Sequence, residues 1–504
     1  MNSGISLSMI VKNEEKHLSD CLNSVKNIVD EIVIVDTGSS DNTIEIAKSF
    51  NANIFQFEWA ADFSAARNFS LSKCTGNWIL YLDADERLDE NSAEIIKSLI
   101  RTNDNIGYYC TIVSYDSEVQ RSNSIKYVRF FRNNPAARFI GKVHEQITPS
   151  LEKLNYKFIH SDLVIHHIGY DISKEGKKRK ALRNLELLKK DFDTSPNDYI
   201  LFQIGQSNFI LENFSEAEKN FTQLIKSDKL NKQFKAESYS YLAQISFNNF
   251  NNKDAENFIS SAIRLNDSQP FYHLLLSKIY LRNSSLKEAI NELNKSIECV
   301  KGLSIFSSDN LQQVNVSLQE ILYYGLQLSY QINDLKLKQK MFEELSAVNE
   351  NKFVELIKLI ESDSTKAFND VSHYIKTINN LNISLLIFIL SKNNNKSFVL
   401  DFLTELYGRF RNNVDVIKQY ALVQGYFNKI SEAINILEVN YSVIKSDPSA
   451  LLYLAMFFLK SNQNENALNI FNAIEKDFSQ YYEIVQKVKA IKEHLMKSIE
   501  VQKD

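Results

Sequence analysis

The sequence Trp78-Ile-Leu-Tyr-Leu-Asp-Ala-Asp-Glu86 changes abruptly from apolar to acidic side chains. Its first five residues are β-forming and contain no charge, which is typical of a central parallel strand covered on both faces. Asp83, Asp85 and Glu86 follow directly, so we expect three carboxylates at the carboxyl edge of a sheet, where open α/β sheets bind ligands. Carboxylates this close together repel one another unless a cation joins them. A divalent ion that carries diphosphate oxygens is the usual partner.

The same acidic residues also allow a simpler interpretation. Aspartate and glutamate favour the first turn of a helix, so the stretch 83–86 could only cap a helix that begins near Asn91. Short acidic motifs are common in proteins. The rest of the N-terminal sequence therefore has to distinguish a ligand site from a helix cap.

Strand and helix patterns alternate through the first hundred residues. Three further strands are predicted over residues 5–11, 31–35 and 53–57. Helices are predicted over 18–25 and 43–50 and from Asp62 onward. Parallel neighbours need such helical crossovers, so the pattern predicts a doubly wound, mostly parallel α/β sheet.

Polar side chains fall where these predicted strands end. Asp36 follows the second strand, Arg67 and Asn68 open the helix before the fourth, and Asp83 and Asp85 follow the fourth. All can converge on one edge, which outlines a nucleotide pocket. Asp36 could hold a ribose or base edge, and its alternative is a plain turn aspartate. Neither GxGxxG nor GxxxxGKS occurs, so a dinucleotide site and a P-loop are both unsupported.

Four motifs together resemble the family 2 glycosyltransferases of GT-A fold. They are Ser8-Met-Ile-Val-Lys-Asn-Glu-Glu15, Val35-Asp-Thr-Gly-Ser-Ser-Asp-Asn-Thr43, Asp62-Phe-Ser-Ala-Ala-Arg-Asn68 and Leu82-Asp-Ala-Asp-Glu86. The most similar subgroup has a tetratricopeptide-like helical tail and includes bacterial enzymes that glycosylate bacteriocin peptides. The likeness covers about residues 5–170, and beyond them it is only architectural.

This resemblance implies a UDP-sugar donor and a Mn²⁺ or Mg²⁺ cofactor. It implies that Asp36 contacts uracil or ribose, that Arg67 contacts the base or the diphosphate, and that Asp83-Ala84-Asp85 is the DxD motif that binds metal-diphosphate. The nucleotide-sugar-binding residues expected from it are Val11, Asn13, Glu14, Asp36, Gly38, Arg67, Asn68, Asp83, Ala84 and Asp85.

The stretch Phe139-Ile-Gly-Lys-Val-His-Glu-Gln-Ile147 holds the expected catalytic residues. Gly141 lets the backbone approach a ligand, and His144 and Glu145 place two titratable groups side by side. An inverting transfer needs one general base to take the acceptor's proton while the nucleophile attacks the anomeric carbon. The resemblance favours Glu145 as that base, and His144 is the rival. A purely structural pair in a loop is the third possibility.

Adjacent histidines follow in Leu163-Val-Ile-His-His-Ile-Gly-Tyr170. Side chains alternate along a strand, so at most one of the two can face a metal. We favour His167 over His166 as a ligand beside Asp83 and Asp85, and a core histidine is the alternative. The basic stretch 174–183 either forms a solvated face or helps to hold diphosphate or an acidic acceptor.

From about residue 197 the sequence becomes repetitive. Small residues at Gly205 and Ala217 and an aromatic residue at Phe221 have the spacing of a tetratricopeptide (TPR) unit. The predicted units are about 197–228, 236–267, 270–301, 414–445 and 448–479, with a degenerate helical segment over 303–412. We therefore expect a GT-A domain over 1–190, with every donor contact, and an all-α TPR-like solenoid over 191–504.

Composition restricts which classes of protein remain possible. A net charge of −4 argues against a dedicated nucleic-acid binder. Four widely spaced cysteines without CxxC favour a reducing, cytoplasmic location. The strongest apolar run, Ile383 to Leu390, is too short to span a bilayer, and the first eight residues lack a basic signal-peptide region. We therefore expect no integral membrane segment.

The leading hypothesis is an inverting, metal-dependent transfer of a hexose or N-acetylhexosamine from a UDP-sugar to a Cys, Ser or Thr side chain of a peptide or protein. The concave face of a solenoid is suited to holding that acceptor. It could instead serve only to form a homodimer. The alternatives are a glycosyltransferase that acts on a glycan and a catalytically idle TPR scaffold. A nucleotidyltransferase of similar fold is a further alternative. Such enzymes need a glycine-rich basic first loop, which this sequence lacks.

Overall fold

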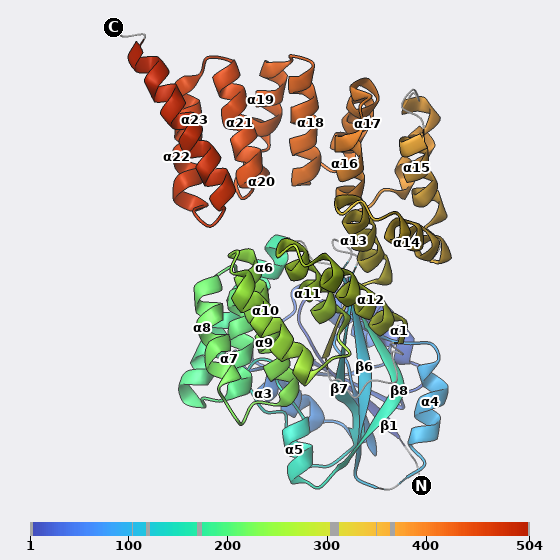
Figure 1. Cartoon of the computed structure of the whole chain (residues 1–504). Coiled ribbons are helices and arrows are strands. Elements are labelled where there is room, and N and C mark those ends of the chain that lie inside the picture. Colours follow the sequence, from blue (N-terminus) through green and yellow to red (C-terminus); the bar gives the residue numbers. More distant parts are fainter. Residues whose placement is uncertain are drawn as a thin grey trace. The chain divides into compact units, whose positions relative to one another are not determined.

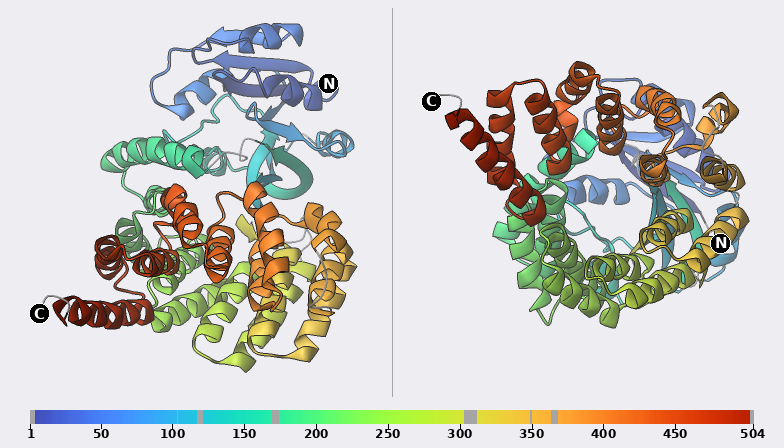
Figure 2. Two further views of the ribbon diagram at one scale, coloured as in Figure 1. Left: turned by 90° about the horizontal axis from the view of Figure 1, so that it is seen from above. Right: turned by 45° about the horizontal axis from the view of Figure 1, so that its top comes forward.

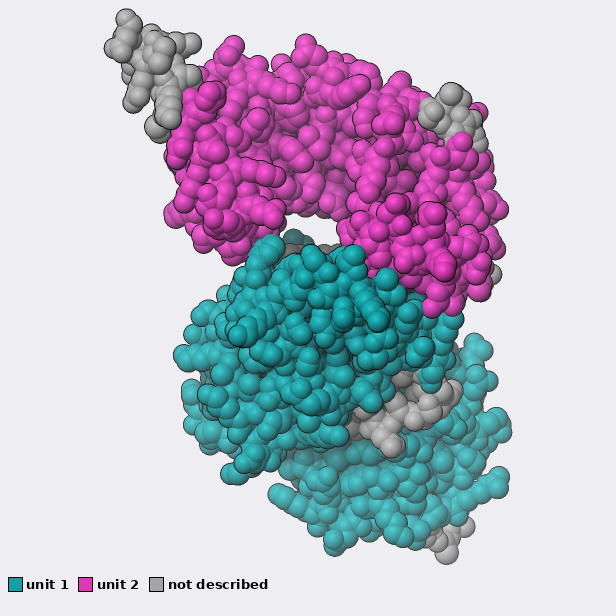
Figure 3. All heavy atoms as spheres, viewed as in Figure 1, with its two compact units in different colours: residues 1–318 teal, residues 319–504 magenta. Residues whose placement is uncertain are grey.

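The chain divides into two compact units, Met1–Leu318 and Gln319–Asp504 (Figure 3). The computed structural model describes residues 4–102, 104–116, 121–168, 174–302, 312–348, 350–362 and 368–501. Three helix pairs of the repeat region belong to the first unit together with the α/β part of the chain (Figure 1). The predicted division after residue 190 lies inside this unit, and as a boundary between sequence modules it stays a prediction.

One nine-stranded sheet forms the core of the first unit. Its order is β3-β2-β1-β4-β7-β6-β8-β5, and β9 pairs with β7 beyond the end of β4. The strands are β1 (Ile5–Val11), β2 (Glu31–Asp36), β3 (Asn53–Gln56), β4 (Trp78–Tyr81), β5 (Glu86–Leu88), β6 (Ile106–Asp116), β7 (Arg121–Arg132), β8 (Lys157–His167) and β9 (Gln312–Asn315).

The sheet is parallel only in part. β1 pairs in parallel with β2 and β4, and β2 with β3, as the crossover pattern predicted. The pairs β4–β7, β6–β7 and β5–β8 are antiparallel. Only four residues separate β6 from β7, which is too few for a parallel crossover. The predicted α/β fold class is confirmed, but the sheet is mixed rather than mostly parallel.

Helices cover both faces of the sheet (Figures 1 and 2). Along β4, Trp78 and Leu80 join the core under α1 and α4, whereas Ile79 and Tyr81 join the core under α3 and α5. This alternation explains why the strand is apolar throughout. The helices are α1 (Leu18–Val25), α2 (Thr43–Ser49), α3 (Phe63–Leu71), α4 (Ser92–Leu99) and α5 (Thr148–Lys153).

The rest of the first unit is a row of antiparallel helix pairs after the long helix α6. The first pair is tight because Gly205 lacks a side chain: a Cβ there would lie 2.8 Å from the Phe221 ring. Consecutive pairs share buried clusters, one formed by α7, α8 and α9 and the next by α9, α10 and α11, as expected for the TPR-like solenoid. The helices are α6 (Lys174–Thr194), α7 (Asp198–Ile210), α8 (Phe214–Ile225), α9 (Lys232–Asn248), α10 (Asn252–Leu265), α11 (Pro270–Arg282) and α12 (Leu286–Gly302).

The second unit is helical throughout its described residues. Its helices are α13 (Leu318–Gln331), α14 (Leu335–Ala347), α15 (Asn351–Ser362), η1 (Phe368–Asp370), η2 (Ser372–Thr377), α16 (Ile383–Lys392), α17 (Lys396–Arg409), α18 (Val414–Tyr426), α19 (Ile430–Val439), α20 (Tyr441–Ile444), α21 (Pro448–Lys460), α22 (Asn464–Asp477) and α23 (Tyr482–Val501). The segment 303–412 is not all helical, because β9 lies within it and pairs with β7.

Two sequence-based expectations can be compared with these elements. All four cysteines lie in the described part of the chain, and each is a free thiol. Among the described helices, none combines the length and the apolar character that crossing a membrane requires.

Glu237 on α9 is an ionisable side chain inside the helical core of the first unit. It is 6% exposed, and burial raises its pKa from 4.5 to about 8. The folded chain therefore holds this proton more tightly than the unfolded chain does, so stability should fall as the pH rises from about 4.5 to about 8. The full effect is up to about 5 kcal/mol at 1.36 kcal/mol per pKa unit.

We predict that Glu237→Gln removes this part of the pH dependence, because the amide carries no titrating proton. The melting temperature of the variant should exceed that of the natural chain at pH 8 and approach it near pH 5. Calorimetry across this range measures the difference, with the exposed Glu218→Gln as the control. Parallel pH profiles for Glu237→Gln and the natural chain would contradict the prediction.

Candidate active site

The loops that follow β1 and β2 are joined at the carboxyl edge of the sheet. The Asn13 side-chain oxygen accepts a hydrogen bond from the Ser40 backbone N–H at 2.8 Å. The Glu14 backbone N–H donates to the Thr43 hydroxyl at 2.7 Å. Asn13 has a positive φ of 57°, a conformation that asparagine tolerates better than most residues. These contacts place Asn13 and Glu14 on the same edge as Asp36.

Asp36 is buried and organises the turn after β2. Its carboxylate accepts hydrogen bonds from the backbone N–H groups of Gly38 and Ser39. Gly38 adopts a φ of +106°, which favours glycine. Val11, the last residue of β1, is buried and accepts through its carbonyl from Thr37. These bonds match the plain turn role of Asp36, and its contact with uracil or ribose stays a prediction.

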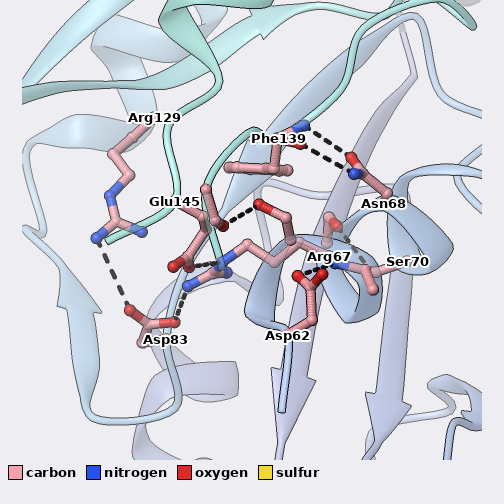
Figure 4. A network of polar contacts seen from close by, with 12 residues as sticks. Asp62, Arg67, Asn68, Ser70, Asp83, Arg129, Phe139 and Glu145 are labelled. Carbon is pink, nitrogen blue, oxygen red and sulfur yellow. Dashed lines mark hydrogen bonds and ion pairs between the residues drawn. The ribbon is translucent and has the colours of Figure 1, made fainter. Parts of the chain in front are cut away.

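Arg67 on α3 bridges two carboxylates that come from distant parts of the chain (Figure 4). Its Nη2 donates to Asp83 Oδ1 at 2.6 Å, and its Nε donates to Glu145. The Arg67 side chain is 8% exposed, and these charges keep its pKa raised although burial alone would lower it. In this structure Arg67 therefore joins the DxD stretch to the expected base.

Arg129 is a second buried cation at the site, and sequence reasoning did not identify it. Tyr108 of β6 pairs with Phe130 and Tyr109 pairs with Val128, so Arg129 is the extra residue of a β-bulge. Bulges redirect side chains, and this one points Arg129 toward Asp83 and Glu86. The available signal was an arginine within the otherwise apolar run from Tyr127 to Phe131.

Arg129 depends on carboxylate partners because burial leaves it few others. Its Nη2 donates to Glu86 Oε1 at 2.8 Å and lies 3.8 Å from Asp83 Oδ2. Its Nε and Nη1 atoms have no hydrogen-bond partner among the described residues, and its guanidinium lies over the Tyr81 ring at 4.4 Å. Glu86, only 1% exposed, also accepts from the Asp83 backbone N–H at 2.9 Å. Glu86 therefore supports the turn that carries Asp83.

Asp83 is partly exposed to solvent. Its side chain is 37% exposed although protein surrounds it on most sides. Burial acts to raise its pKa, but the charges of Arg67 and Arg129 outweigh that effect and hold the pKa well below its usual range. Asp83 is therefore a carboxylate at neutral pH.

Asp85 and His167 face each other across the end of β8. Asp85 Oδ2 and His167 Nε2 are 3.1 Å apart, and His167 Nδ1 lies 3.2 Å from the Ser114 hydroxyl. Burial acts to lower the His167 pKa, but the hydrogen bond and charge of Asp85 raise it overall. His166 points to the other side and contacts Asp89 at 3.1 Å. The alternation along β8 thus places His167, not His166, beside the DxD stretch.

Glu14 belongs to the same acidic edge as Asp83 and Asp85. Glu14 has its pKa raised to about 7, first by burial and then by the charges of Asp85 and Asp83. A divalent cation suits such a group, and Asp85 with His167 offers an oxygen and a nitrogen ligand. Among the described residues, no three His, Cys, Asp or Glu side chains converge closely enough to hold a metal. Oxygens of a bound diphosphate would have to complete its shell.

The loop with Glu145 is closed by a pair of backbone hydrogen bonds between Ile140 and Gln146. Within it, Gly141 has a φ of +100° and His144 a φ of 54°. His144 contacts solvent, yet the surrounding protein and the charge of Lys180 lower its pKa to about 4. His144 is therefore neutral at pH 7. A neutral imidazole can accept a proton, so His144 stays the rival of Glu145.

Two other predicted residues have mainly structural contacts. Asn68 exchanges two hydrogen bonds with the backbone of Phe139, through its Nδ2 at 3.0 Å and its Oδ1 at 2.7 Å. Ala84 is buried between Asp83 and Asp85. Asn68 ties α3 to the beginning of the Glu145 loop, and its predicted donor contact remains a prediction.

Residues 6–168 match the family model described as Glycosyl transferase family 2. With the mixed α/β sheet and its acidic edge, this match makes the N-terminal part of the chain a family 2 glycosyltransferase domain. The resemblance seen in the four motifs is thereby confirmed for this domain, and the acidic stretch is not a helix cap, since β5 separates it from α4.

The chain is 32% identical over 216 residues to the SPbeta prophage-derived glycosyltransferase SunS of Bacillus subtilis, covering 42% of this chain and 51% of that relative. It is 34% identical over 208 residues to a TPR repeat-containing protein of Synechococcus elongatus, covering 40% and 51%. The chain spans about half the length of these curated relatives. The crystal structure of S. aureus TarS 1–349 with UDP-GlcNAc aligns with 62% of this chain and 100% of that chain, at 14% identity and a TM-score of 0.29.

We predict that Arg129→Met destabilises the domain by about 3 to 5 kcal/mol, because it leaves the Glu86 carboxylate buried without a cation. Adding Glu86→Gln should recover part of the loss, since the amide can still accept from Asp83. Urea unfolding followed by the fluorescence of Trp59 and Trp78, the only two tryptophans, measures both variants. A double variant that is no more stable than Arg129→Met alone would argue against the pairing of Arg129 with Glu86.

Proposed function

We propose that this chain transfers a sugar, with inversion, from a UDP-sugar to a cysteine, serine or threonine side chain of a peptide or protein. The observation that carries the proposal is the ion-pair bridge through Arg67 that joins Asp83 to Glu145 in a family 2 domain, with Asp85 two residues along the chain. The likeness to SunS, a glycosyltransferase, supports the reaction class.

The donor diphosphate would lie along the edge formed by the loops after β1, β2 and β4. Asp36 and Asn13 would face the nucleoside, and Asp85 and His167 would hold a divalent cation against the diphosphate. When bound, Mn²⁺ or Mg²⁺ would neutralise charge on the departing diphosphate. Mn²⁺ suits the nitrogen ligand better, because Mg²⁺ prefers oxygen.

Glu145 would act as the general base. It would take the proton from the acceptor thiol or hydroxyl while that atom forms a bond to the anomeric carbon and the bond from that carbon to the diphosphate breaks. Arg67 holds the Glu145 carboxylate in place, and His144 remains the rival base. A thiol with a pKa near 8.5 needs less assistance than an alcohol does.

The helical repeats would hold the acceptor polypeptide or form a homodimer. The likeness to a TPR repeat-containing protein supports either role.

Incubation with a panel of UDP-sugars and either Mn²⁺ or Mg²⁺ tests the reaction through UDP release. Intact-mass analysis of peptides from cells with and without this protein reports the acceptor and the added sugar mass together. Absence of UDP release with every donor would refute the proposal.

We expect Asp85→Asn to weaken metal-dependent binding of the UDP-sugar by at least about tenfold with little loss of stability, because it removes a charged ligand from a crowded acidic edge. Calorimetric titration with and without Mn²⁺ measures the effect. Asp89→Asn is the matched control, since Asp89 faces His166 instead. A sharp fall in stability with unchanged metal dependence would assign Asp85 a structural role.

We expect Glu145→Gln to keep the affinity for UDP-sugar and to lower turnover by about two to four orders of magnitude, the usual effect of losing a general base. Steady-state kinetics with the acceptor measures both quantities. Glu152→Gln, an exposed change on α5, is the control. Undiminished turnover would move the role to His144 or to another carboxylate.

A further inference from the structure

The loop that carries Glu145 is held from two sides. On the side of the sheet, the Phe63 backbone N–H donates to the Lys142 carbonyl at 3.0 Å, and the Ser64 hydroxyl donates to the Gly141 carbonyl. Both donors open α3, the helix that also supplies Arg67. These bonds set one edge of the loop, and the opposite edge has different partners.

The other side of the loop contacts the helical region. The Lys142 backbone N–H donates to Asp191 Oδ2 at 3.2 Å, and Asp191 is 7% exposed on α6. Lys142 thus has its carbonyl bonded to α3 and its N–H bonded to α6. The backbone of this one residue therefore ties the loop both to α3 and to the long helix α6.

Val143 fixes the same loop by apolar packing. It is 6% exposed and belongs to a separate hydrophobic cluster of the first unit. Its buried partners come from two helices, Leu185 and Leu188 on α6 and Ile200 and Ile204 on α7. Glu145 lies only two residues beyond this anchor, so a shift of Val143 would be passed to the carboxylate.

A polar contact strengthens the connection on the far side of Glu145. The Tyr199 side chain of α7 lies close to the side chains of Gln146, Tyr127 and Gln203. Gln146 is the residue that closes the loop with Ile140. Of the two neighbours of the pair His144-Glu145, Val143 is packed against α6 and α7, and Gln146 lies close to α7.

We propose that the first helices of the repeat region are part of the catalytic apparatus, with Asp191 and Ile204 as positioning residues for Glu145. The inference rests on the proposed function of Glu145. It goes beyond the expectation that every donor contact lies within residues 1–190, because Asp191, Ile200 and Ile204 follow that point in the chain. A small misplacement of a catalytic group can cost about 10²-fold in rate.

The test uses the full-length chain and two variants, Asp191→Ala and Ile204→Ala. Each should lower kcat for UDP release about 10- to 100-fold while the KM for the UDP-sugar changes less than about threefold. Asp191→Asn should restore most of kcat, since its amide oxygen can accept from Lys142, and Ile204→Val should do so by refilling the cluster. Ile259→Ala, in the buried core of α10, is the matched control and should keep kcat.

Hydrogen exchange of the backbone amides at residues 140–146 provides a readout that does not depend on turnover. Asp191→Ala and Ile204→Ala should speed exchange there about tenfold or more, and Ile259→Ala should not. Unchanged exchange and kcat in the two variants, or equal losses in Ile259→Ala, would overturn the inference. Faster exchange in the two variants, together with a natural chain that releases no UDP from any donor, would uphold the positioning and refute the proposed function.

Discussion

Arg67 is a buried cation shared by two carboxylates, and the candidate site depends on this sharing. A guanidinium with 8% of its side chain exposed would be costly without compensating charge. Asp83 supplies that charge from the end of β4, and Glu145 supplies it from a loop some sixty residues later. The need to neutralise one cation thus brings together the residues expected to hold the donor and the residue expected to activate the acceptor.

The same constraint divides the acidic edge into two parts. Asp83 and Glu86 are compensated by Arg67 and Arg129, so they behave as fixed elements of the structure. Asp85 has only the ring of His167 as its hydrogen-bonded side-chain partner among the described residues, and its charge helps to raise the pKa of Glu14. The part of the edge around Asp85, where no described arginine forms an ion pair, is therefore where a metal with its diphosphate would be stabilised most.

The helical region adds a second function to its expected part in acceptor binding. Val143 lies in a cluster formed by α6 and α7, so the loop between β7 and α5 is not complete within the α/β domain alone. This explains why the first helix pairs belong to the same compact unit as the sheet. A glycosyltransferase domain and a repeat array that appear separate in the sequence share one apolar cluster beside the expected base.

The sequence by itself determined the parallel strands, the acidic edge and the helical pairs, because each rests on local periodicity or on residues adjacent in the chain. It also placed one histidine toward Asp85, since side chains alternate along a strand. Only the tertiary structure decided that Arg129 enters the site, that Arg67 bridges Asp83 to Glu145 and that Val143 packs on α7. A bulge register, a shared ion pair and a packing cluster each join residues far apart in the chain, and no local pattern encodes such pairings.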